Sequence, residues 1–362
     1  MKILSLFDGM ACGHIAFNEL GIDIECYKAY EIDKFAIKVA THNFSDIEEL
    51  GDVFKADFKQ YNDYDWLIGG SPCTYWSIAQ SPDKCETTSS GIGWELFSQY
   101  VRALHEAKPK YFLYENNKSM SKEIRKAITE TFGFEPICIN SALVSAQNRQ
   151  RLYWVGIRQD DGSYKKADIK QPEDKGIIVR DILDTNVDEI LYTTVNNKVK
   201  TLLAGYCCVS QFDLIKGGTY SRTALCNKVF ELPSTKNGKQ TDSQGTRVYD
   251  IEYKSCAQTA QGGGQGARTG LYAVPDATNK ALCVKDGYVD YKGKQYPIKL
   301  SDGYYIIRKL SVTECKRLQT IPDWYDMSCI SNSQAYKCLG NGWTVDVIKH
   351  LIKSALEDSK KS

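Results

Sequence analysis

Histidine is scarce in this sequence, and its cysteines do not form metal-binding pairs. Only four histidines are scattered along 362 residues, and none of the thirteen cysteines belongs to a Cys-x-x-Cys motif. A structural zinc site therefore has no ligand framework, and we expect no metal ion. The odd number of cysteines also argues against a disulfide scaffold. We expect reduced thiols, most of them acting as small core residues.

Long apolar runs are absent as well. No stretch approaches the roughly 18 apolar residues that a membrane helix needs. The first apolar run, Ile3 to Phe7, is ended by Asp8 and is too short for the core of a secretion signal. We therefore expect a cytoplasmic protein without a membrane partner.

The composition is that of a folded protein with an uneven charge distribution. Apolar residues make up 42% and charged residues 25% of the chain, which excludes disorder along its whole length. The length suggests about two domains. Residues 186–331 carry a net charge of +5 and the rest of the chain carries −4. Such a basic segment is compatible with a bound polyanion, although a solvated basic surface would explain it equally well.

The first 160 residues alternate between strand and helix patterns, which indicates an α/β fold with a mostly parallel sheet. Strands are expected at residues 2–7, 24–31, 65–70, 111–116 and 151–158, and helices at 14–20, 34–43, 94–107 and 122–132. From about residue 186 the runs become short and rich in Tyr, Thr, Lys and Gly, which is typical of an irregular, mostly β domain. Helical patterns return at residues 311–320 and 344–356.

A glycine-rich turn follows the first expected strand. The segment LFDGMACG (residues 6–13) allows close backbone approach to a ligand at a helix N-terminus, and Glu31 ends the second strand about 20 residues later. The full G-x-G-x-x-G spacing is absent, so an adenosyl ligand without phosphates suits this turn better than NAD. A plain βα turn is the alternative.

Two further segments follow strands that should end at the same edge of the sheet. Cys73 lies in GGSPCTYWSIAQ (residues 69–80), next to Pro72, where a thiol is placed as a nucleophile. The polar residues 80–91 that follow could close as a lid. Glu115 lies in YENN, where a partly buried carboxyl can donate a proton. A buried cysteine and a salt-bridged carboxylate are the alternatives.

A fourth segment, AQNRQR, precedes the strand at 151–158. Gln147, Arg149 and Arg151 alternate, so in an extended conformation they share one face. Two cations and an amide on one face suit a phosphate or a carboxylate such as Glu115. A solvated charged edge is the alternative.

Taken in this order, the motifs resemble those of the DNA (cytosine-5) methyltransferases over nearly the whole chain. The turn FDGMACG looks most like that of the de novo vertebrate enzymes. The second domain looks more like that of bacterial restriction–modification methyltransferases, through QGTRVYDIE (residues 244–252) and the QGGG run. The remaining matches are Glu31, Asp52-Val53, Pro72-Cys73, Glu115-Asn116, the Gln147/Arg149/Arg151 triplet, RKLSVTECKRLQTIPDWY (308–325) and GNGWTVDVIKHL (340–351).

The resemblance implies a fold and a reaction. It implies a Rossmann-like S-adenosylmethionine-dependent methyltransferase sheet in residues 1–185 plus 332–362, and a smaller, mostly β target-recognition domain and hinge in residues 186–331. The substrate would be a cytosine flipped out of double-stranded DNA. The enzyme would act as a monomer, separately from any cognate restriction endonuclease.

The resemblance also assigns roles to residues. Cys73 would add to C6 of the cytosine, Glu115 would act on N3 and the exocyclic amine, and Arg149 and Arg151 would support them. Arg151 would also hold O2, and Gln244 would fill the vacated stack. The residues implied to bind S-adenosylmethionine are Phe7, Asp8, Gly9, Glu31, Asp52, Val53, Pro72 and Asn341. Those implied to bind DNA are Ser77, Gln244 and Arg247.

The chain departs from the family pattern in three places. Asn117 stands where valine is usual, Ala257-Gln258 stands where the recognition domain has Thr-Leu, and Gly342-Trp343 stands where Ser-Val is more frequent. The last departure concerns a wall of the cofactor pocket.

Three other functions compete with this interpretation. The size of segment 186–310 argues against a transfer-RNA cytosine-5 methyltransferase, because sequence-specific reading of a duplex needs a distinct recognition domain. Retention of Cys73, Glu115 and Arg151 argues against a catalytically silent DNA-binding regulator. A nicotinamide dehydrogenase would lack its glycine motif and would leave Cys73 without a role.

Overall fold

The computed structural model describes residues 1–72, 75–76, 85–184, 228–231, 235–236, 239–240, 247–258, 270–275, 282–291 and 294–361. Its N-terminal part is an α/β unit around a sheet of order β3-β2-β1-β4-β5-β7-β6, in which β8 pairs with β7. Five strands are parallel: β1 (Lys2–Leu6), β2 (Cys26–Tyr30), β3 (Ile47–Glu49), β4 (Trp66–Gly69) and β5 (Tyr111–Asn117). The other three run antiparallel to their neighbours: β6 (Ile137–Asn140), β7 (Gln150–Arg158) and β8 (Tyr164–Lys166).

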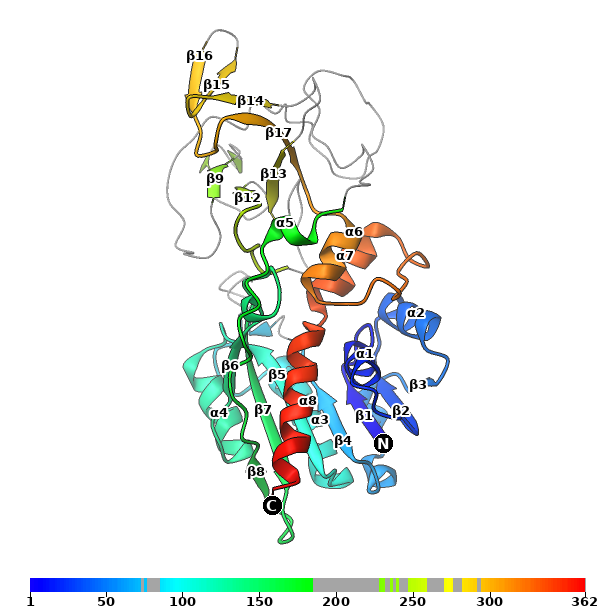
Figure 1. The fold of residues 1–362 in the computed structure, drawn as a ribbon. Helices are drawn as coiled ribbons and strands as arrows, with labels where there is room; N and C mark the ends of the chain where they lie inside the picture. Colours follow the sequence, from blue (N-terminus) through cyan, green and yellow to red (C-terminus); the bar gives the residue numbers. More distant parts are fainter. Residues whose placement is uncertain are drawn as a thin grey trace.

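Helices cover both faces of this sheet (Figure 1). The helices α1 (Cys12–Glu19), α2 (Lys34–Asn43) and α8 (Val345–Ser359) pack on one face, and α3 (Ile92–Ala107) and α4 (Lys122–Phe132) pack on the other. Alternation along β5 explains the two layers. Leu113 points into the first core, whereas Phe112 and Tyr114 point into the second. The expected α/β class is therefore confirmed.

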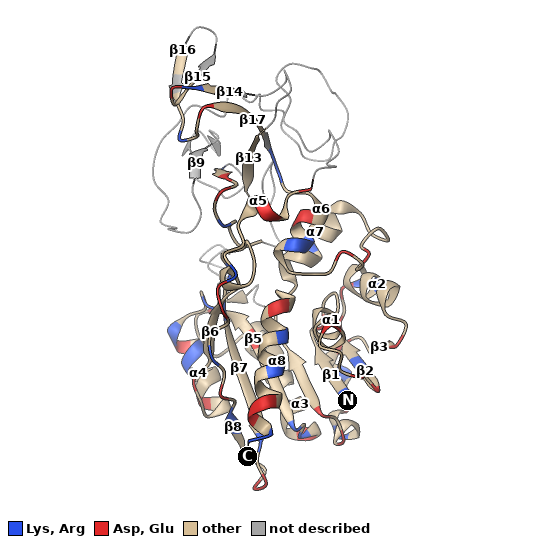
Figure 2. Ribbon diagram, viewed as in Figure 1, with Lys and Arg blue, Asp and Glu red and all other residues tan. Residues whose placement is uncertain are grey.

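The central strands are almost free of charge, as strands buried on both faces must be. β4 reads WLIG and carries no charged residue, and β5 reads YFLYENN and carries only Glu115. Figure 2 shows the charged residues along the outer helices α4 and α8 instead. A carboxyl group near the end of an otherwise uncharged, buried strand needs partners, and those partners define the site described below.

A second sheet lies beyond the carboxyl ends of the parallel strands (Figure 1) and has the order β16-β15-β14-β17-β13-β12-β9. Its strands are β9 (Lys228–Glu231), β12 (Arg247–Asp250), β13 (Leu271–Pro275), β14 (Leu282–Lys285), β15 (Tyr288–Tyr291), β16 (Lys294–Pro297) and β17 (Gly303–Arg308). A short pair, β10 (Thr235–Lys236) and β11 (Lys239–Gln240), stands apart. The described residues of this second part are thus mostly β, as expected.

Three helices connect the two parts: α5 (Val179–Ile182), α6 (Val312–Leu318) and α7 (Asn332–Asn341). The expected helices at 34–43 and 122–132 are found with the same bounds. The short strands β3 and β6 and helix α7 escaped the sequence patterns. Among the described residues, no helix is both long enough and apolar enough to cross a membrane.

A buried ion pair ties together the two chain segments that enter and leave the second part. Arg308, the last residue of β17, donates to both carboxylate oxygens of Glu314 on α6, at 2.8 and 2.7 Å. Glu314 also accepts from the backbone N–H groups of Ser311 and Asp184. Both charged side chains are almost fully buried. The pair therefore fixes how the second part is joined to the first.

We expect Arg308→Ala to lower the free energy of unfolding by about 3–5 kcal/mol, because it leaves the Glu314 carboxylate buried without its cation. Urea denaturation of the purified protein measures this change. Lys126→Ala is the matched control, since Lys126 forms an exposed i,i+4 pair with Glu130 on α4. An unchanged unfolding midpoint for Arg308→Ala would contradict the role of the pair.

Candidate active site

The turn that leads to Cys73 is held by the neighbouring strand β5. Asn116 donates from its side-chain nitrogen to the carbonyl of Ser71 at 3.2 Å and to the hydroxyl of Tyr114 at 3.1 Å. The Ser71 hydroxyl also lies 2.6 Å from the Tyr114 hydroxyl. Ser71, just before Pro72, is thus hydrogen-bonded through both its backbone carbonyl and its side-chain hydroxyl. Cys73 itself lies outside the described residues.

Glu115 projects from β5 toward this turn. A Cβ placed on Gly70 would lie only 2.9 Å from Glu115 Oε2 and 2.9 Å from its backbone oxygen. Glycine at position 70 therefore lets the carboxyl group approach the chain three residues before Cys73. Glu115 and the chain at Gly70 therefore lie at the same edge of the sheet.

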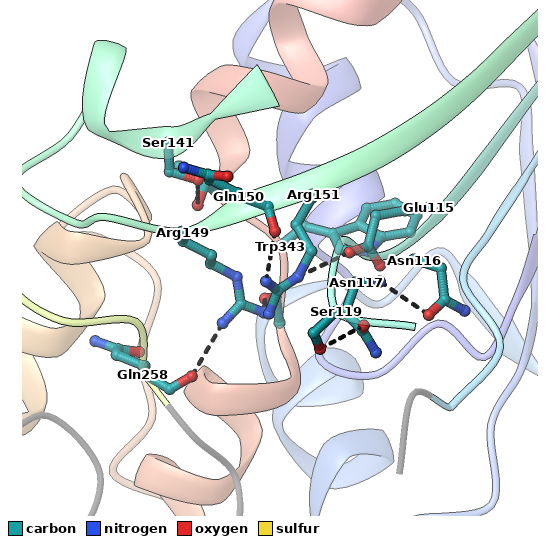
Figure 3. A network of polar contacts seen from close by, with 12 residues as sticks. Glu115, Asn116, Asn117, Ser119, Ser141, Arg149, Gln150, Arg151, Gln258 and Trp343 are labelled. Carbon is teal, nitrogen blue, oxygen red and sulfur yellow. Dashed lines mark hydrogen bonds and ion pairs between the residues drawn. The ribbon is translucent and has the colours of Figure 1, made fainter. Parts of the chain in front are cut away.

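Two side chains hold the Glu115 carboxylate from opposite ends (Figure 3). Arg151 Nε, on the adjacent strand β7, lies 3.1 Å from Oε1. Trp343 donates its indole N–H to Oε2 at 3.1 Å. The Glu115 side chain is 12% exposed, so these charge-assisted contacts are largely shielded from water. The group can still be reached by a ligand at this edge.

Arg149 has a different set of partners from Arg151. Its guanidinium is buried and donates to three backbone carbonyls: those of Gln258, Gly340 and Gly342. Gln258 belongs to the second part of the chain (Figure 3), whereas Gly340 lies in the last turn of α7 and Gly342 in the α7–α8 junction. Arg149 therefore joins segments that are distant in the sequence. The alternating sequence pattern alone did not distinguish this role of Arg149 from that of Arg151.

The other end of the sheet edge is formed by Gly9, Glu31 and Asp52. Glu31 accepts hydrogen bonds from the backbone N–H groups of Gly9, Ile32 and Asp33, at 2.8, 2.7 and 2.8 Å. The Asp52 side chain accepts a hydrogen bond from the backbone N–H of Phe54 and so caps the 3₁₀ turn that begins at Val53. Asp52 also lines a hollow of about 290 Å³ beside β2 and β3.

Asp8 contributes a buried acceptor to the same edge. One carboxylate oxygen accepts from the hydroxyls of Ser5 and Tyr27, at 2.5 and 2.6 Å, and the other has no partner among the described residues. Gly9, with φ +64°, has open space where a side chain would be. An unsatisfied buried acceptor beside an unobstructed turn fits a ligand that carries a positive charge.

The remaining predicted residues fall into two groups. Phe7 is half-buried with φ 57°, Val53 is buried, Pro72 and Asn341 are exposed, and Arg247 begins β12. Ser77, Gln244, residues 80–84 of the proposed lid and the QGGG run lie outside the described residues. The structure thus brings Glu115, Arg151 and the Pro72 turn together, and Gly9, Glu31 and Asp8 together.

Comparison with known proteins identifies the family to which the chain belongs. The C-5 cytosine-specific DNA methylases match residues 1–357. The chain belongs to this family. The orphan methyltransferase M.Rho11sI of Bacillus phage rho11s is 29% identical over 81% of this chain, which spans only 63% of that protein. The type II methyltransferase M.HhaI of Haemophilus parahaemolyticus is 25% identical over 97% of this chain and 93% of its own length.

The fold agrees with that membership. The S. pombe Dnmt2 methyltransferase superposes with a TM-score of 0.59 over 99% of this chain and 98% of its own, at 18% identity. The expected family, the Rossmann-like methyltransferase fold and the enzyme class, DNA (cytosine-5) methyltransferase, are confirmed. The methyl donor of such methyltransferases is S-adenosylmethionine, and their substrate is DNA.

The structure reveals two exposed apolar side chains of this methyltransferase that the sequence did not single out. Ile32 is 77% exposed directly after Glu31, and Phe54 is 50% exposed two residues after Asp52. Large apolar side chains left in water beside acids that are expected to bind an adenosyl ligand are suited to cover a purine ring. The sequence contained a signal for both residues, because Ile32 and Phe54 lie just after an acidic residue near the end of a strand. Apolar residues at such positions are more often buried, so the signal did not single them out.

Asp8 should make the stability of the methyltransferase depend on pH. Burial raises the pKa of its carboxyl from 3.8 to about 6, partly opposed by the hydrogen bonds from Ser5 and Tyr27. Between about pH 4 and pH 6 the folded protein therefore keeps a proton that the unfolded chain has lost. This contribution to stability is complete below pH 4 and disappears as the pH rises through 6.

We expect Asp8→Asn to remove this contribution. Relative to wild type, the free energy of unfolding of the variant should rise by up to about 3 kcal/mol between pH 4 and pH 7. Urea denaturation at both pH values measures it. Burial and, next, the Asp8 charge also raise the pKa of Glu49 to about 8, so loss of the Asp8 charge relaxes that shift and acts in the same direction. A variant-to-wild-type difference that is equal at the two pH values would contradict the prediction.

Proposed function

We propose that this chain methylates C5 of cytosine at a specific site in double-stranded DNA, with Cys73 as nucleophile and Glu115 as the acid. The observation that carries the proposal is the close approach of the Glu115 carboxylate to Gly70, which precedes Cys73 by three residues in the sequence. Both carboxylate oxygens of Glu115 are held, one by Arg151 and one by Trp343, which supports a role in which the carboxyl group faces the cytosine ring in a single orientation.

The chemistry explains why a thiol and an acid are needed together. C5 of cytosine is a poor nucleophile inside an aromatic ring. Addition of the Cys73 thiolate to C6 moves an electron pair toward N3, and Glu115 hydrogen-bonds or protonates N3 as charge develops there. C5 then has enamine character. After C5 is methylated, loss of its proton and departure of the Cys73 thiolate restore the C5–C6 double bond.

S-Adenosylmethionine supplies the electrophilic methyl group on a positively charged sulfur. In this proposal, Glu31 and Asp52 bind the adenosine of S-adenosylmethionine. The Asp8 carboxylate, next to Gly9, lies close to a positively charged group of the same ligand. The unsatisfied oxygen of Asp8 and the open space at Gly9 support this assignment. The complete set proposed to bind it is Phe7, Asp8, Gly9, Glu31, Asp52, Val53, Pro72 and Asn341.

Around the base, Arg151 orients Glu115 and holds O2, while Arg149 supports the site by joining the α7–α8 junction to the second part. The base must leave the stack to reach Cys73. We assign Ser77, Gln244 and Arg247 to DNA contacts, and residues 80–91 to a lid. The domain division is proposed as residues 1–185 plus 332–362 for catalysis and 186–331 for target recognition and hinge.

Arg247→Ala is expected to relax sequence preference at one base next to the target. A bidentate arginine contact to guanine contributes about 1–3 kcal/mol of discrimination. Methylation profiling on random-sequence DNA measures the preference. An arginine that contacts only phosphate would give the other result, namely an unaltered target motif with weaker, less salt-dependent binding to all sequences.

The whole proposal is tested by expressing the chain in a host free of DNA methylation and sequencing its DNA after bisulfite treatment. We expect 5-methylcytosine within one short motif. In vitro, labelled S-adenosylmethionine should transfer label to duplex DNA and not to transfer RNA. Label on transfer RNA alone would assign the chain to the RNA-modifying alternative. Unmodified DNA and RNA would refute the proposal.

We further propose that the enzyme works as a monomer in the cytoplasm and separately from any cognate restriction endonuclease. Its family's relatives include both an orphan enzyme of a phage and a type II enzyme of a bacterium. Methylation by the purified chain alone, eluting at the mass of one copy, is the expected result. A requirement for a second protein would contradict it.

A further inference from the structure

Trp343 occupies a position where this family more often has valine, and it makes a contact that valine cannot make. Its indole N–H donates to Glu115 Oε2 at 3.1 Å, while Arg151 Nε lies 3.1 Å from Oε1 (Figure 3). An indole N–H can only donate a hydrogen bond. Each carboxylate oxygen has about two acceptor sites, so each keeps one site available for a substrate.

The backbone around Trp343 is fixed by close packing. A Cβ on Gly342 would lie 3.2 Å from the Cys12 sulfur and 3.3 Å from the Cys338 carbonyl oxygen, so a larger residue would require these neighbours to shift by a few tenths of an ångström. The Gly342 carbonyl accepts from Arg149 at 3.0 Å. The backbone N–H of Trp343 also hydrogen-bonds to the Cys12 thiol. The tryptophan thus touches the glycine-rich turn with its backbone and Glu115 with its side chain.

A second donor matters because the terminal torsion of a glutamate side chain is weakly constrained. One contact from Arg151 holds one oxygen and leaves the carboxyl plane free to rotate. A contact on each oxygen determines the plane. The direction in which the free acceptor sites point toward the cytosine ring is then determined as well.

We propose that Trp343 is a positioning residue for Glu115, whose indole N–H holds the carboxyl group in the orientation that acts on cytosine N3. This inference rests on the proposed function of Glu115. It differs from a role as a wall of the cofactor site, because it predicts an effect on a reaction that needs no cofactor.

That reaction is hydrogen exchange at C5. When Cys73 adds to C6, C5 can take a proton from water; loss of the original hydrogen from C5 and departure of the thiolate then regenerate cytosine. DNA that carries tritium at cytosine C5 releases it into water by this route. The exchange uses Cys73 and Glu115 and proceeds without S-adenosylmethionine, so it reports on the acid alone.

The test is Trp343→Phe, which keeps an aromatic ring and removes the donor. We expect tritium release without cofactor, and kcat for methylation, each to fall about tenfold, the loss of one hydrogen bond to a charged group. KM for S-adenosylmethionine and Kd for DNA should stay within twofold of wild type. Unchanged exchange with a raised KM would overturn the proposal and leave Trp343 as a pocket wall.

Trp324→Phe is the matched control. Trp324 is 48% exposed and donates its indole N–H to a surface carboxylate, Glu19, at 3.3 Å. This variant should keep both rates. If Trp343→Phe does not fold, Trp343→Val, which installs the residue more frequent in the family, should show the same loss in exchange. Full exchange activity in folded Trp343→Val would overturn the proposal. If wild type itself neither exchanges nor methylates, the proposed function has failed instead.

Discussion

Cys73→Ser is expected to abolish methylation, with a loss on the order of 10³-fold or more in turnover. The reaction depends on a thiolate that adds to C6 and later leaves, and a serine hydroxyl is too weakly acidic to supply the corresponding anion at neutral pH. DNA affinity should stay close to that of wild type, because the side chains differ by one atom. Single-turnover methylation and a DNA-binding assay measure the two quantities.

Trapping with 5-fluorocytosine identifies the nucleophile directly. Once C5 has been methylated, fluorine occupies the place of the proton that must leave, so the thiolate cannot be expelled and a covalent adduct persists. Peptide mapping of this adduct should find it on Cys73. Cys12 is a poor alternative, because burial raises the pKa of its thiol to about 12. Cys85→Ser is the control and should trap normally; an adduct on Cys85 would contradict the assignment.

Glu115→Gln is expected to lower turnover by about 10²-fold or more while DNA affinity changes little. The amide has the shape of the carboxyl group but cannot take up and return a proton. The carboxyl acts as charge develops on the ring, so its loss removes transition-state stabilisation rather than binding. Single-turnover methylation at saturating DNA and S-adenosylmethionine measures the effect.

The control for this change is Glu123→Gln. Glu123 is an exposed carboxylate in the first turn of α4, and its variant should methylate at the wild-type rate. Because Glu115→Gln also takes a partner from Arg151, its unfolding midpoint should be measured alongside. A stable Glu115→Gln protein with an unchanged single-turnover rate would remove Glu115 from the mechanism.

Long periodic elements and local motifs were predictable from the sequence because their signals are contained in a few neighbouring residues. The helices at 34–43 and 122–132 are amphipathic over several turns, and both begin at a capping residue, Asp33 and Ser121. Short elements were not predictable. The strand β3 has three residues and β6 has four, which is too few for a period to show.

Residue type and spacing were enough to predict the family, the α/β class and the residues that carry the family's motifs, because these features are local to the sequence. The contacts of those residues became visible only in the folded chain. Arg149 and Arg151 are two positions apart, yet one binds backbone carbonyls and the other binds Glu115. The contact between Trp343 and Glu115 spans 228 positions. Such contacts depend on how the strands and the α7–α8 junction pack together, and no local pattern encodes that packing.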